Sequence, residues 1–278
     1  MPELPEVETI RRELERDIVG KKIKTVDVTN NRSIRRHANR KQFTSRLEGA
    51  KITAVTRRGK YLLVKLDTDE VLVVHLGMSG QLLRLAAKDP AIKHTHVVIT
   101  FTQGGQLRFV DPRTFGELFV TAPDDLERDV PELAELGIDP VEQPMSWVDF
   151  GHLLRAHNMK LKAFLMDQKI IAGIGNIYSD EILHAAGLRY DRTTESLSTQ
   201  EIRRLYRAVV ETLHDAIKYG GSTLSDQQYV DPSGKPGEYQ EYHQVYDREK
   251  LPCRRCRGTV VKAKFAGRST YYCEQCQM

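Results

Sequence analysis

Four cysteines near the end of the chain form two Cys-x2-Cys pairs. Cys253 and Cys256 are separated from Cys273 and Cys276 by sixteen residues. A Cys-x2-Cys turn directs two thiolates toward one point, and a second turn across a β-hairpin completes a tetrahedron around zinc. Because four thiolates leave no open coordination position, we expect one structural Zn2+ that takes no part in catalysis. Disulfides or free thiols are the alternative.

The first residues could supply a nucleophile. Removal of Met1 would expose the secondary amine of Pro2. An α-amino group titrates near pH 8, so roughly a tenth of it is neutral at pH 7. Glu3 and Glu6 lie beside it and could transfer protons. Taken alone, these residues favour a simpler interpretation, in which Pro2 and Pro5 start a helix whose first turn carries acids.

Charge is segregated along the chain, although the net charge is only +4. Residues 248–278 carry eight Lys and Arg against two acids, whereas residues 121–149 carry nine acids and one base. Segregated positive charge is typical of a protein that binds a polyanion such as nucleic acid. A solvated basic face without a partner is the alternative interpretation.

Length and composition exclude several classes. The 278 residues are enough for two domains, and 40% hydrophobic with 29% charged residues is ordinary for a folded protein. No apolar run reaches the roughly eighteen residues of a membrane span. The N-terminus is charged from its third residue, which excludes a secretory signal. We therefore expect the cysteines in a reducing compartment, where disulfides are disfavoured.

The elements that position these residues differ between the two halves of the chain. In the first half, Val7, Ile10, Leu14 and Ile18 share one helical face, and Gly20 ends that helix. Short Val-, Ile- and Leu-rich runs follow with no helical pattern between them, which predicts an antiparallel sandwich or barrel. The runs cover residues 22–29, 51–66, 70–78, 95–101, 106–111 and 116–121.

The second half is predicted to be helical. An acidic, proline-punctuated linker covers residues 124–149. The last helix should start with a capping box formed by Ser198 and Glu201 and end at Gly220. The polar stretch from Ser222 to Gln244 is typical of a mobile loop. The expected helices cover residues 146–157, 160–168, 177–186 and 199–219.

Three motifs in sequence order resemble the formamidopyrimidine-DNA glycosylase family, bacterial enzymes that excise oxidised purines such as 8-oxoguanine. They are MPELPEVET at residues 1–9, GNIYSDE at residues 175–181 and GRSTYYCEQCQ at residues 267–277. The resemblance covers the whole chain. It implies a bifunctional glycosylase and AP lyase of base excision repair that acts through Schiff base formation and β,δ-elimination.

The resemblance implies an α+β multidomain fold. Its N-terminal catalytic β-sandwich with a leading helix would occupy residues 1–130, and a helix-two-turn-helix domain with a lesion-capping loop residues 131–243. A four-cysteine zinc-finger hairpin would occupy residues 244–278. The implied partner is double-stranded DNA that contains oxidised purines, bound by a monomer with no membrane association. The implied location is the bacterial cytoplasm, in association with the nucleoid.

The family's catalytic residues fall on matching positions. Pro2 matches the nucleophile that attacks the sugar C1′, and Glu3 matches the carboxyl group that assists base loss, with Glu6 as an auxiliary. Lys60 matches the lysine that assists β-elimination and contacts phosphate. Arg268 matches the zinc-finger arginine that serves δ-elimination and binds the phosphate beside the lesion. A guanidinium on a metal-fixed hairpin can hold a phosphate through two hydrogen bonds.

DNA contacts also carry over from the family. A glycosylase must flip its target nucleotide out of the duplex and fill the gap, and the matching residues are Met78, Arg113 and Phe115. Met and Phe are suited to intercalation, and Arg can hydrogen-bond the orphaned cytosine. Core positions are the alternative for Met78 and Phe115. Further matches are His94, Lys162 and Asn176 at the backbone and the capping loop from Ser225 to Tyr239.

Two other functions remain possible from the sequence. An endonuclease VIII-type enzyme shares the N-terminal proline but prefers oxidised pyrimidines. Leu4 and the set of Met78, Arg113 and Phe115 favour the purine branch instead. A non-catalytic DNA-binding relative would have lost catalytic residues, yet all four expected here are present.

Overall fold

The computed structural model describes residues 1–278, which form two compact units. Unit 1 comprises residues 1–134 and 219–238, and unit 2 comprises residues 135–218 and 239–278. The sequence placed the capping loop with the helical domain, whereas the structure groups residues 219–238 with unit 1. The reason is that Tyr229 is buried in the hydrophobic core of unit 1.

Helix α1 (Leu4–Ile18) opens unit 1 as predicted. Its apolar face, which includes Val7, Ile10 and Leu14, is almost fully buried in the core of unit 1. The helix ends at Ile18, with Val19 as its C-cap, and the next residue, Gly20, has a φ of 85° in the left-handed region that glycine adopts without strain.

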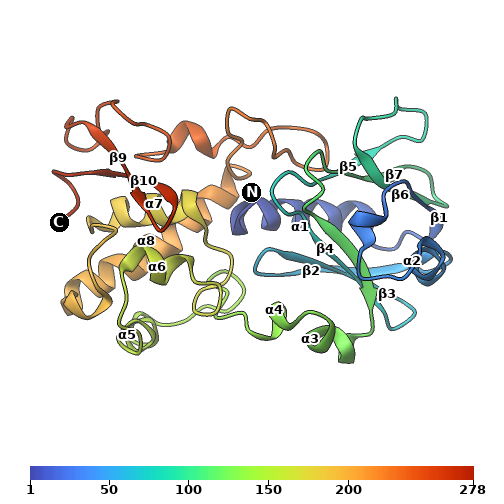
Figure 1. Ribbon diagram of the computed structural model, residues 1–278, viewed down its shortest axis with the longest axis horizontal. Helices are drawn as coiled ribbons and strands as arrows, with labels where there is room; N and C mark the ends of the chain where they lie inside the picture. The colour runs from blue at the N-terminus through green and yellow to red at the C-terminus, as the bar shows by residue number, and fades with distance from the viewer. The chain divides into compact units, whose positions relative to one another are not determined.

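Two four-stranded antiparallel sheets make up the rest of unit 1 (Figure 1). One has the order β1-β6-β7-β5, the other the order β2-β3-β4-β8, and one core cluster takes residues from both. The predicted β-sandwich is therefore confirmed. The strands are β1 (Ile23–Val28), β2 (Ile52–Arg58), β3 (Tyr61–Leu66), β4 (Val71–His75), β5 (Gln81–Leu85), β6 (Thr95–Phe101), β7 (Gln106–Val110) and β8 (Glu117–Thr121).

The expectation of no helix among these strands is wrong. Helix α2 (Arg40–Leu47) follows β1, and Asn39 caps it by accepting a hydrogen bond from the Gln42 N–H at 2.9 Å. Only Phe43 and Leu47 of this helix are buried, so its apolar periodicity was too weak to detect.

Unit 2 contains the predicted helices. The acidic segment before it holds two one-turn helices, α3 (Leu126–Asp129) and α4 (Pro131–Ala134). The predicted capping box is present, since Ser198 N–H donates to Glu201 Oε2 at 2.8 Å and Glu201 N–H donates to Ser198 Oγ at 3.3 Å. The longer helices are α5 (Trp147–Arg155), α6 (Leu161–Met166), α7 (Asn176–Ala186) and α8 (Thr199–Lys218).

A β-hairpin of β9 (Val260–Phe265) and β10 (Arg268–Cys273) completes unit 2. Its two-residue turn consists of Ala266 and Gly267, both with positive φ, as in the type I′ turn that suits the twist of antiparallel strands. The turn places Arg268 at the exposed tip of the hairpin. None of the helices combines the length and hydropathy that a membrane span requires.

Candidate functional site

The four cysteine sulfurs lie within 4.8 Å of one another. The distance is 3.8 Å from Cys253 Sγ to Cys276 Sγ and 3.4 Å from Cys256 Sγ to Cys273 Sγ. A tetrahedron with Zn–S bonds of about 2.3 Å requires sulfur–sulfur distances of about 3.8 Å. The four thiols therefore fit one structural zinc ion, as their spacing predicted.

The environment of Cys253 favours its thiolate. Burial raises the pKa of this thiol, but hydrogen bonds, chiefly from the backbone N–H groups of Cys256 and Arg255, outweigh burial and lower the pKa to about 7. The Nε2 of His184 on α7 also lies 3.4 Å from Cys253 Sγ. Burial, with the charges of Arg255 and Arg248, lowers the pKa of His184 to about 4, so its ring is neutral. Since a thiolate accepts hydrogen bonds, Nε2–H is the donor. The sequence reasoning missed His184.

A buried carboxylate connects α7 to the hairpin. Asp180 Oδ1 accepts hydrogen bonds from Lys162 Nζ and Thr270 Oγ1, both at 2.7 Å, and Oδ2 accepts one from Tyr271 N–H at 2.8 Å. Burial raises the pKa of Asp180 to about 6, although Lys162 opposes this. The expectation that Lys162 contacts DNA is corrected here, because its side chain has no exposed surface and its ammonium group serves this internal network.

Asn176 bonds the hairpin residue that directly follows Arg268. Asn176, the first residue of α7, donates from Nδ2 to Ser269 O at 2.9 Å, and Lys162 Nζ donates to the same carbonyl at 3.3 Å. The neighbouring Arg268 is exposed. Two elements of unit 2 therefore fix the hairpin backbone beside this guanidinium.

The N-terminal end of α1 is held by Glu6. Its Oε2 accepts a hydrogen bond from Glu3 N–H and its Oε1 accepts one from Ser222 N–H, both at 2.7 Å. Pro2 and Glu3 are buried there. Gly221 has a φ of 77°, which other residues adopt only with strain, and a Cβ there would lie 2.7 Å from Glu6 Oε1, so glycine is favoured at this approach. The expected auxiliary acid thus also links the start of α1 to the start of the capping loop.

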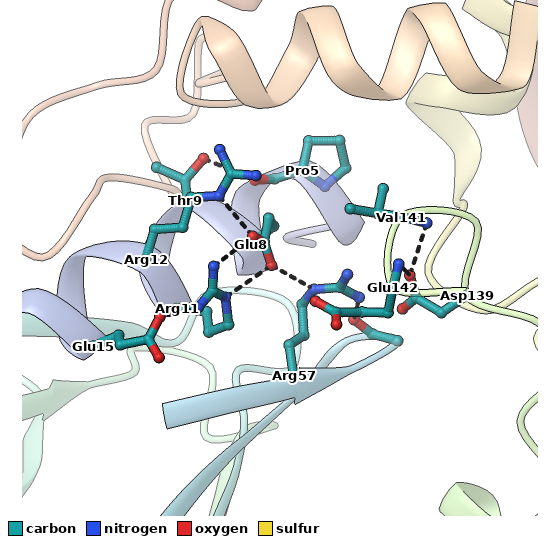
Figure 2. Close-up of polar contacts among 11 residues, drawn as sticks. Pro5, Glu8, Thr9, Arg11, Arg12, Glu15, Arg57, Asp139, Val141 and Glu142 are labelled. Atoms are coloured by element: carbon teal, nitrogen blue, oxygen red, sulfur yellow. Dashed lines mark hydrogen bonds and ion pairs between the residues drawn. The ribbon is translucent and has the colours of Figure 1, made fainter. Parts of the chain in front are cut away.

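Glu8, two residues further along α1, lies at the centre of an arginine cluster (Figure 2). Its carboxylate accepts hydrogen bonds from Arg11, Arg12 and Arg57 at 2.7–3.1 Å. Burial raises the pKa of Glu8, but the bonds from Arg11 and Arg12 and the charge of Arg57 lower it to about 2. Arg57 Nη1 also donates to Gly59 O at 2.9 Å. The cluster therefore connects α1 to the turn that carries Lys60.

Lys60 follows Gly59 in the turn between β2 and β3 and is half-buried. The rings of its neighbour Tyr61 and of His75 have centroids 4.7 Å apart. Burial lowers the pKa of His75 to about 4, and the charge of Lys60 acts in the same direction. A neutral His75 is thus close enough to Lys60 to feel its charge, and the sequence did not single it out. The sequence feature that could have indicated it is the position of His75, a polar residue at the end of the apolar strand β4.

Two loops present the expected intercalating residues. Met78 and Phe115 are 36% and 45% exposed, so the alternative that they are core residues does not hold. The Arg113 guanidinium lies 5.1 Å from the centre of the Phe115 ring. His94 is also exposed, and its carbonyl accepts a hydrogen bond from Asp111 N–H at 3.0 Å.

The capping loop is anchored at Tyr229. Its hydroxyl donates to Gly220 O and its carbonyl accepts from Thr223 Oγ1, both at 2.8 Å. Ser225 between these anchors is exposed. The expected residues therefore fall into one group in unit 1 and another in unit 2. The first holds Pro2, Glu3, Lys60, Met78, His94, Arg113 and Phe115, and the second holds Lys162, Asn176, Arg268 and the four cysteines.

Three family models match the chain in order. The formamidopyrimidine-DNA glycosylase N-terminal domain matches residues 1–118, and the H2TH domain of the same enzymes matches residues 136–228. The zinc finger found in FPG and IleRS matches residues 250–277. The last of these includes all four cysteines of the proposed zinc site.

Curated relatives and solved structures are similar over the full length. The formamidopyrimidine-DNA glycosylases of Pelotomaculum thermopropionicum and Thermus thermophilus are 42% and 43% identical, over 100% of this chain and 99% and 98% of theirs. The crystal structure of the Thermus thermophilus protein gives a TM-score of 0.88 at 41% identity, covering 99% of this chain and 98% of that one. A Lactococcus lactis Fpg mutant in complex with DNA containing Fapy-dG gives 0.90 at 35% identity, with both chains covered completely.

Proposed function

Because the chain belongs to the formamidopyrimidine-DNA glycosylase family and is a DNA glycosylase of base excision repair, we propose that it excises oxidised purines from double-stranded DNA. Its substrates are 8-oxoguanine and formamidopyrimidines, and it also cleaves the resulting abasic site. The solved complexes of Lactococcus lactis Fpg with DNA containing Fapy-dG or an abasic site support this substrate class.

Pro2 is the proposed nucleophile. After removal of Met1, its neutral secondary amine attacks the sugar C1′ and the glycosidic bond breaks. The electron pair of that bond leaves with the base, which takes up a proton, and the Pro2 nitrogen loses its own proton. The C1′–O4′ bond of the sugar then breaks and O4′ takes up a proton, which leaves an iminium ion between Pro2 and the opened sugar. Glu3, buried next to Pro2, assists base loss as a proton donor or through the sugar oxygen.

Strand cleavage follows from the iminium ion, because its positive charge acidifies the proton on C2′. Loss of that proton expels the 3′ phosphate, and a second elimination expels the 5′ phosphate. Lys60 assists the first elimination and contacts phosphate, while Arg268 stabilises a phosphate during the second. Both cationic side chains favour the departing anions electrostatically. His94 and Asn176 are proposed contacts to the DNA backbone.

Base flipping depends on the exposed side chains of Met78, Arg113 and Phe115. Met78 and Phe115 intercalate to fill the space that the flipped nucleotide leaves, and Arg113 hydrogen-bonds the orphaned cytosine. Zinc, when bound, supplies a cross-link that fixes the hairpin bearing Arg268. Acting on chromosomal DNA, the protein would reside in the cytoplasm with the nucleoid.

The observation that best supports this chemistry is the arrangement at the start of α1. Pro2 and Glu3 occupy its N-terminal end, and Glu8 connects the same helix through Arg57 to the turn that carries Lys60. The proposed nucleophile, acid and lysine are thus attached to one buried framework in unit 1.

Borohydride trapping tests the proposal. A duplex containing 8-oxoguanine opposite cytosine is incubated with the protein and borohydride, and intact mass and peptide mapping locate the adduct. We expect a covalent complex at Pro2 in protein that lacks Met1. Trapping should be much weaker in Pro2→Gly, which has a primary amine in place of the secondary one and should still bind the lesion. Trapping at the wild-type level by protein that retains Met1, in which the Pro2 nitrogen is part of a peptide bond, would exclude Pro2 as the nucleophile. A strong preference for an oxidised pyrimidine duplex would instead assign the endonuclease VIII-type function.

A further inference from the structure

We propose that Asp111 is a positioning residue that joins the two intercalating loops, so that Met78, Arg113 and Phe115 enter DNA as one rigid wedge. This inference depends on the proposed base flipping. The Met78 loop comprises residues 76–80, between β4 and β5, and the Phe115 loop comprises residues 111–116, between β7 and β8.

The Asp111 carboxylate is the link between the loops. It has no exposed surface, and its Oδ1 accepts a hydrogen bond from Ser79 Oγ at 2.5 Å. Its Oδ2 accepts one from Gly116 N–H at 2.8 Å, and Arg113 N–H lies 3.3 Å from Oδ1. One buried carboxylate thus bonds the residue next to Met78 and the residue next to Phe115.

The backbones of the two loops also interlock. A Cβ on Gly77, whose φ is 60°, would lie 2.6 Å from both Gly116 N and Phe115 C. A Cβ on Gly116 would lie 3.0 Å from the carbonyl oxygens of His75 and Leu76. The two loop backbones are therefore in close contact at both glycines, where a side chain would not fit.

The opposite side of the Phe115 loop is held by arginines. Arg35 donates to Gly116 O at 2.9 Å and forms an ion pair with Glu117 at 3.1 Å, while Arg32 donates to Thr114 O at 3.1 Å. The N–H groups of Arg113 and Gly116 therefore bond the Asp111 carboxylate, whereas the carbonyls of Thr114 and Gly116 accept from arginines. This leaves the Phe115 side chain as its exposed apolar part.

A rigid wedge has a specific advantage for base flipping. Unstacking a base step requires a few kcal/mol. A side chain on a mobile loop would be displaced before the bases separate. The residues next to Met78 and Phe115 are instead bonded to one buried carboxylate, which holds both side chains in place on the β-sandwich while the bases unstack. Loss of Asp111 should therefore impair substrates that need flipping more than those that do not.

The test compares two duplexes under single-turnover conditions, one with 8-oxoguanine opposite cytosine and one with a preformed abasic site. Asp111→Asn keeps the side-chain volume but offers one carbonyl oxygen where the carboxylate offered two. We expect excision of 8-oxoguanine to fall about 10- to 100-fold, the effect of one buried unsatisfied N–H group, and abasic-site cleavage to change by less than about threefold.

Two further variants and one optical signal complete the test. Ser79→Ala removes the bond from Ser79 Oγ to Asp111 and the bond that Arg113 N–H donates to Ser79 Oγ at 3.2 Å. It leaves the bond between Asp111 and Gly116 N–H, so we expect a smaller loss with the same selectivity. Asp67→Asn makes the same chemical change at an Asp that bonds Lys51 N–H in the sandwich, and should leave both rates unchanged. Fluorescence of 2-aminopurine beside the lesion should rise more slowly in Asp111→Asn than in wild type.

The possible outcomes distinguish a failure of the Asp111 role from a failure of the proposed glycosylase function. Equal losses on both duplexes, or no loss on 8-oxoguanine, would overturn the role of Asp111 while leaving the glycosylase function intact. If Asp111→Asn fails to fold, Ser79→Ala tests the role of Asp111 in its place. A larger loss on 8-oxoguanine than on the abasic site would support that role, and equal losses would overturn it. Wild-type protein that cleaves neither duplex would overturn the proposed function, and this inference with it.

Discussion

Lys162 Nζ lies 2.7 Å from Asp180 Oδ1, and the two side chains are 0% and 1% exposed. Asp180 also bonds Thr270 and Tyr271 of β10. A buried charge without its partner costs more than the pair contributes. This ion pair therefore makes the docking of the hairpin on α7 depend on both residues.

Lys162→Met should lower the free energy of unfolding by about 3–5 kcal/mol, because it leaves Asp180 buried without its cation. Adding Asp180→Asn should recover part of the loss, since the uncompensated charge is then gone. Urea unfolding of the single and double variants measures both effects. Lys169→Met is the control, as its ion pair with Glu135 is largely exposed, and it should change stability by less than about 1 kcal/mol. Equal losses for Lys162→Met and Lys169→Met would contradict the prediction.

Removal of zinc, by a chelator or by Cys273→Ser, should abolish DNA binding while the β-sandwich stays folded. Metal-binding free energy contributes directly to the folding of such a hairpin, whereas the sandwich belongs to unit 1 and contains none of the cysteines. Fluorescence anisotropy with an abasic-site duplex measures binding. Zinc, but not magnesium, should restore it after chelation. A fully active protein without zinc would contradict the assignment.

His184→Phe should weaken zinc binding by roughly 10- to 100-fold, as expected when a hydrogen bond to a metal ligand is lost. Its Nδ1 is buried without a partner, so the apolar ring should cost little stability when zinc is saturating. Competition with a chromophoric chelator measures the affinity. His214→Phe, at an exposed position on α8, should retain the wild-type value. Unchanged affinity in His184→Phe would show that the contact with Cys253 is incidental.

Arg268→Ala should keep its zinc and lose roughly 1.5–3 kcal/mol of binding free energy, or about one to two decades in affinity. The slope of log affinity against log salt should flatten by about one unit, because one phosphate contact is lost. Arg268→Lys should lie between wild type and Arg268→Ala, since it keeps the charge without the planar fork. Salt titrations measure all three proteins, with Arg207→Ala on α8 as the control. A wild-type slope and affinity in Arg268→Ala would exclude the phosphate contact.

Glu8 should contribute to acid unfolding. Its pKa in the folded protein, about 2, lies below the ordinary value of 4.5. The carboxylate therefore stabilises the fold above pH 4.5, and this contribution is lost as the pH falls toward 2. After allowance for solvent screening it amounts to about 1–2 kcal/mol. Glu8→Gln should lack this part of the pH dependence in urea unfolding between pH 5 and 2, whereas Glu211→Gln, at an exposed acid, should retain it.

The sequence predicted those elements whose pattern is local. The apolar face of α1, the Val- and Ile-rich strands and the capping box of α8 each involve residues a few positions apart. Helix α2 and strand β5 were missed because burial in the sandwich, rather than their own periodicity, stabilises them. The short helices in the acidic linker were missed for the same reason.

The site residues that could be predicted from the sequence are likewise those with a local pattern. Cysteine spacing was enough to predict the zinc ligands, and turn glycines indicated the exposure of Met78 and Phe115. Asp180, Asp111 and His184 have no comparable signal, because their partners lie 18, 32 and 69 residues away in the chain. The prediction for Lys162 failed because a lysine that pairs inside the protein cannot be distinguished from a surface lysine without its partner.

The path of the chain bears on how the protein folds during synthesis. Unit 1 is interrupted after residue 134 and resumes only at residue 219, with Tyr229 filling part of its core. Translation of the 84 intervening residues, 135–218, at about 5–20 per second delays completion of that core by about 4–17 s. The nascent β-sandwich must persist for that time with its core incomplete, so chaperone capture and ribosome pausing before residue 219 should affect the yield of native protein.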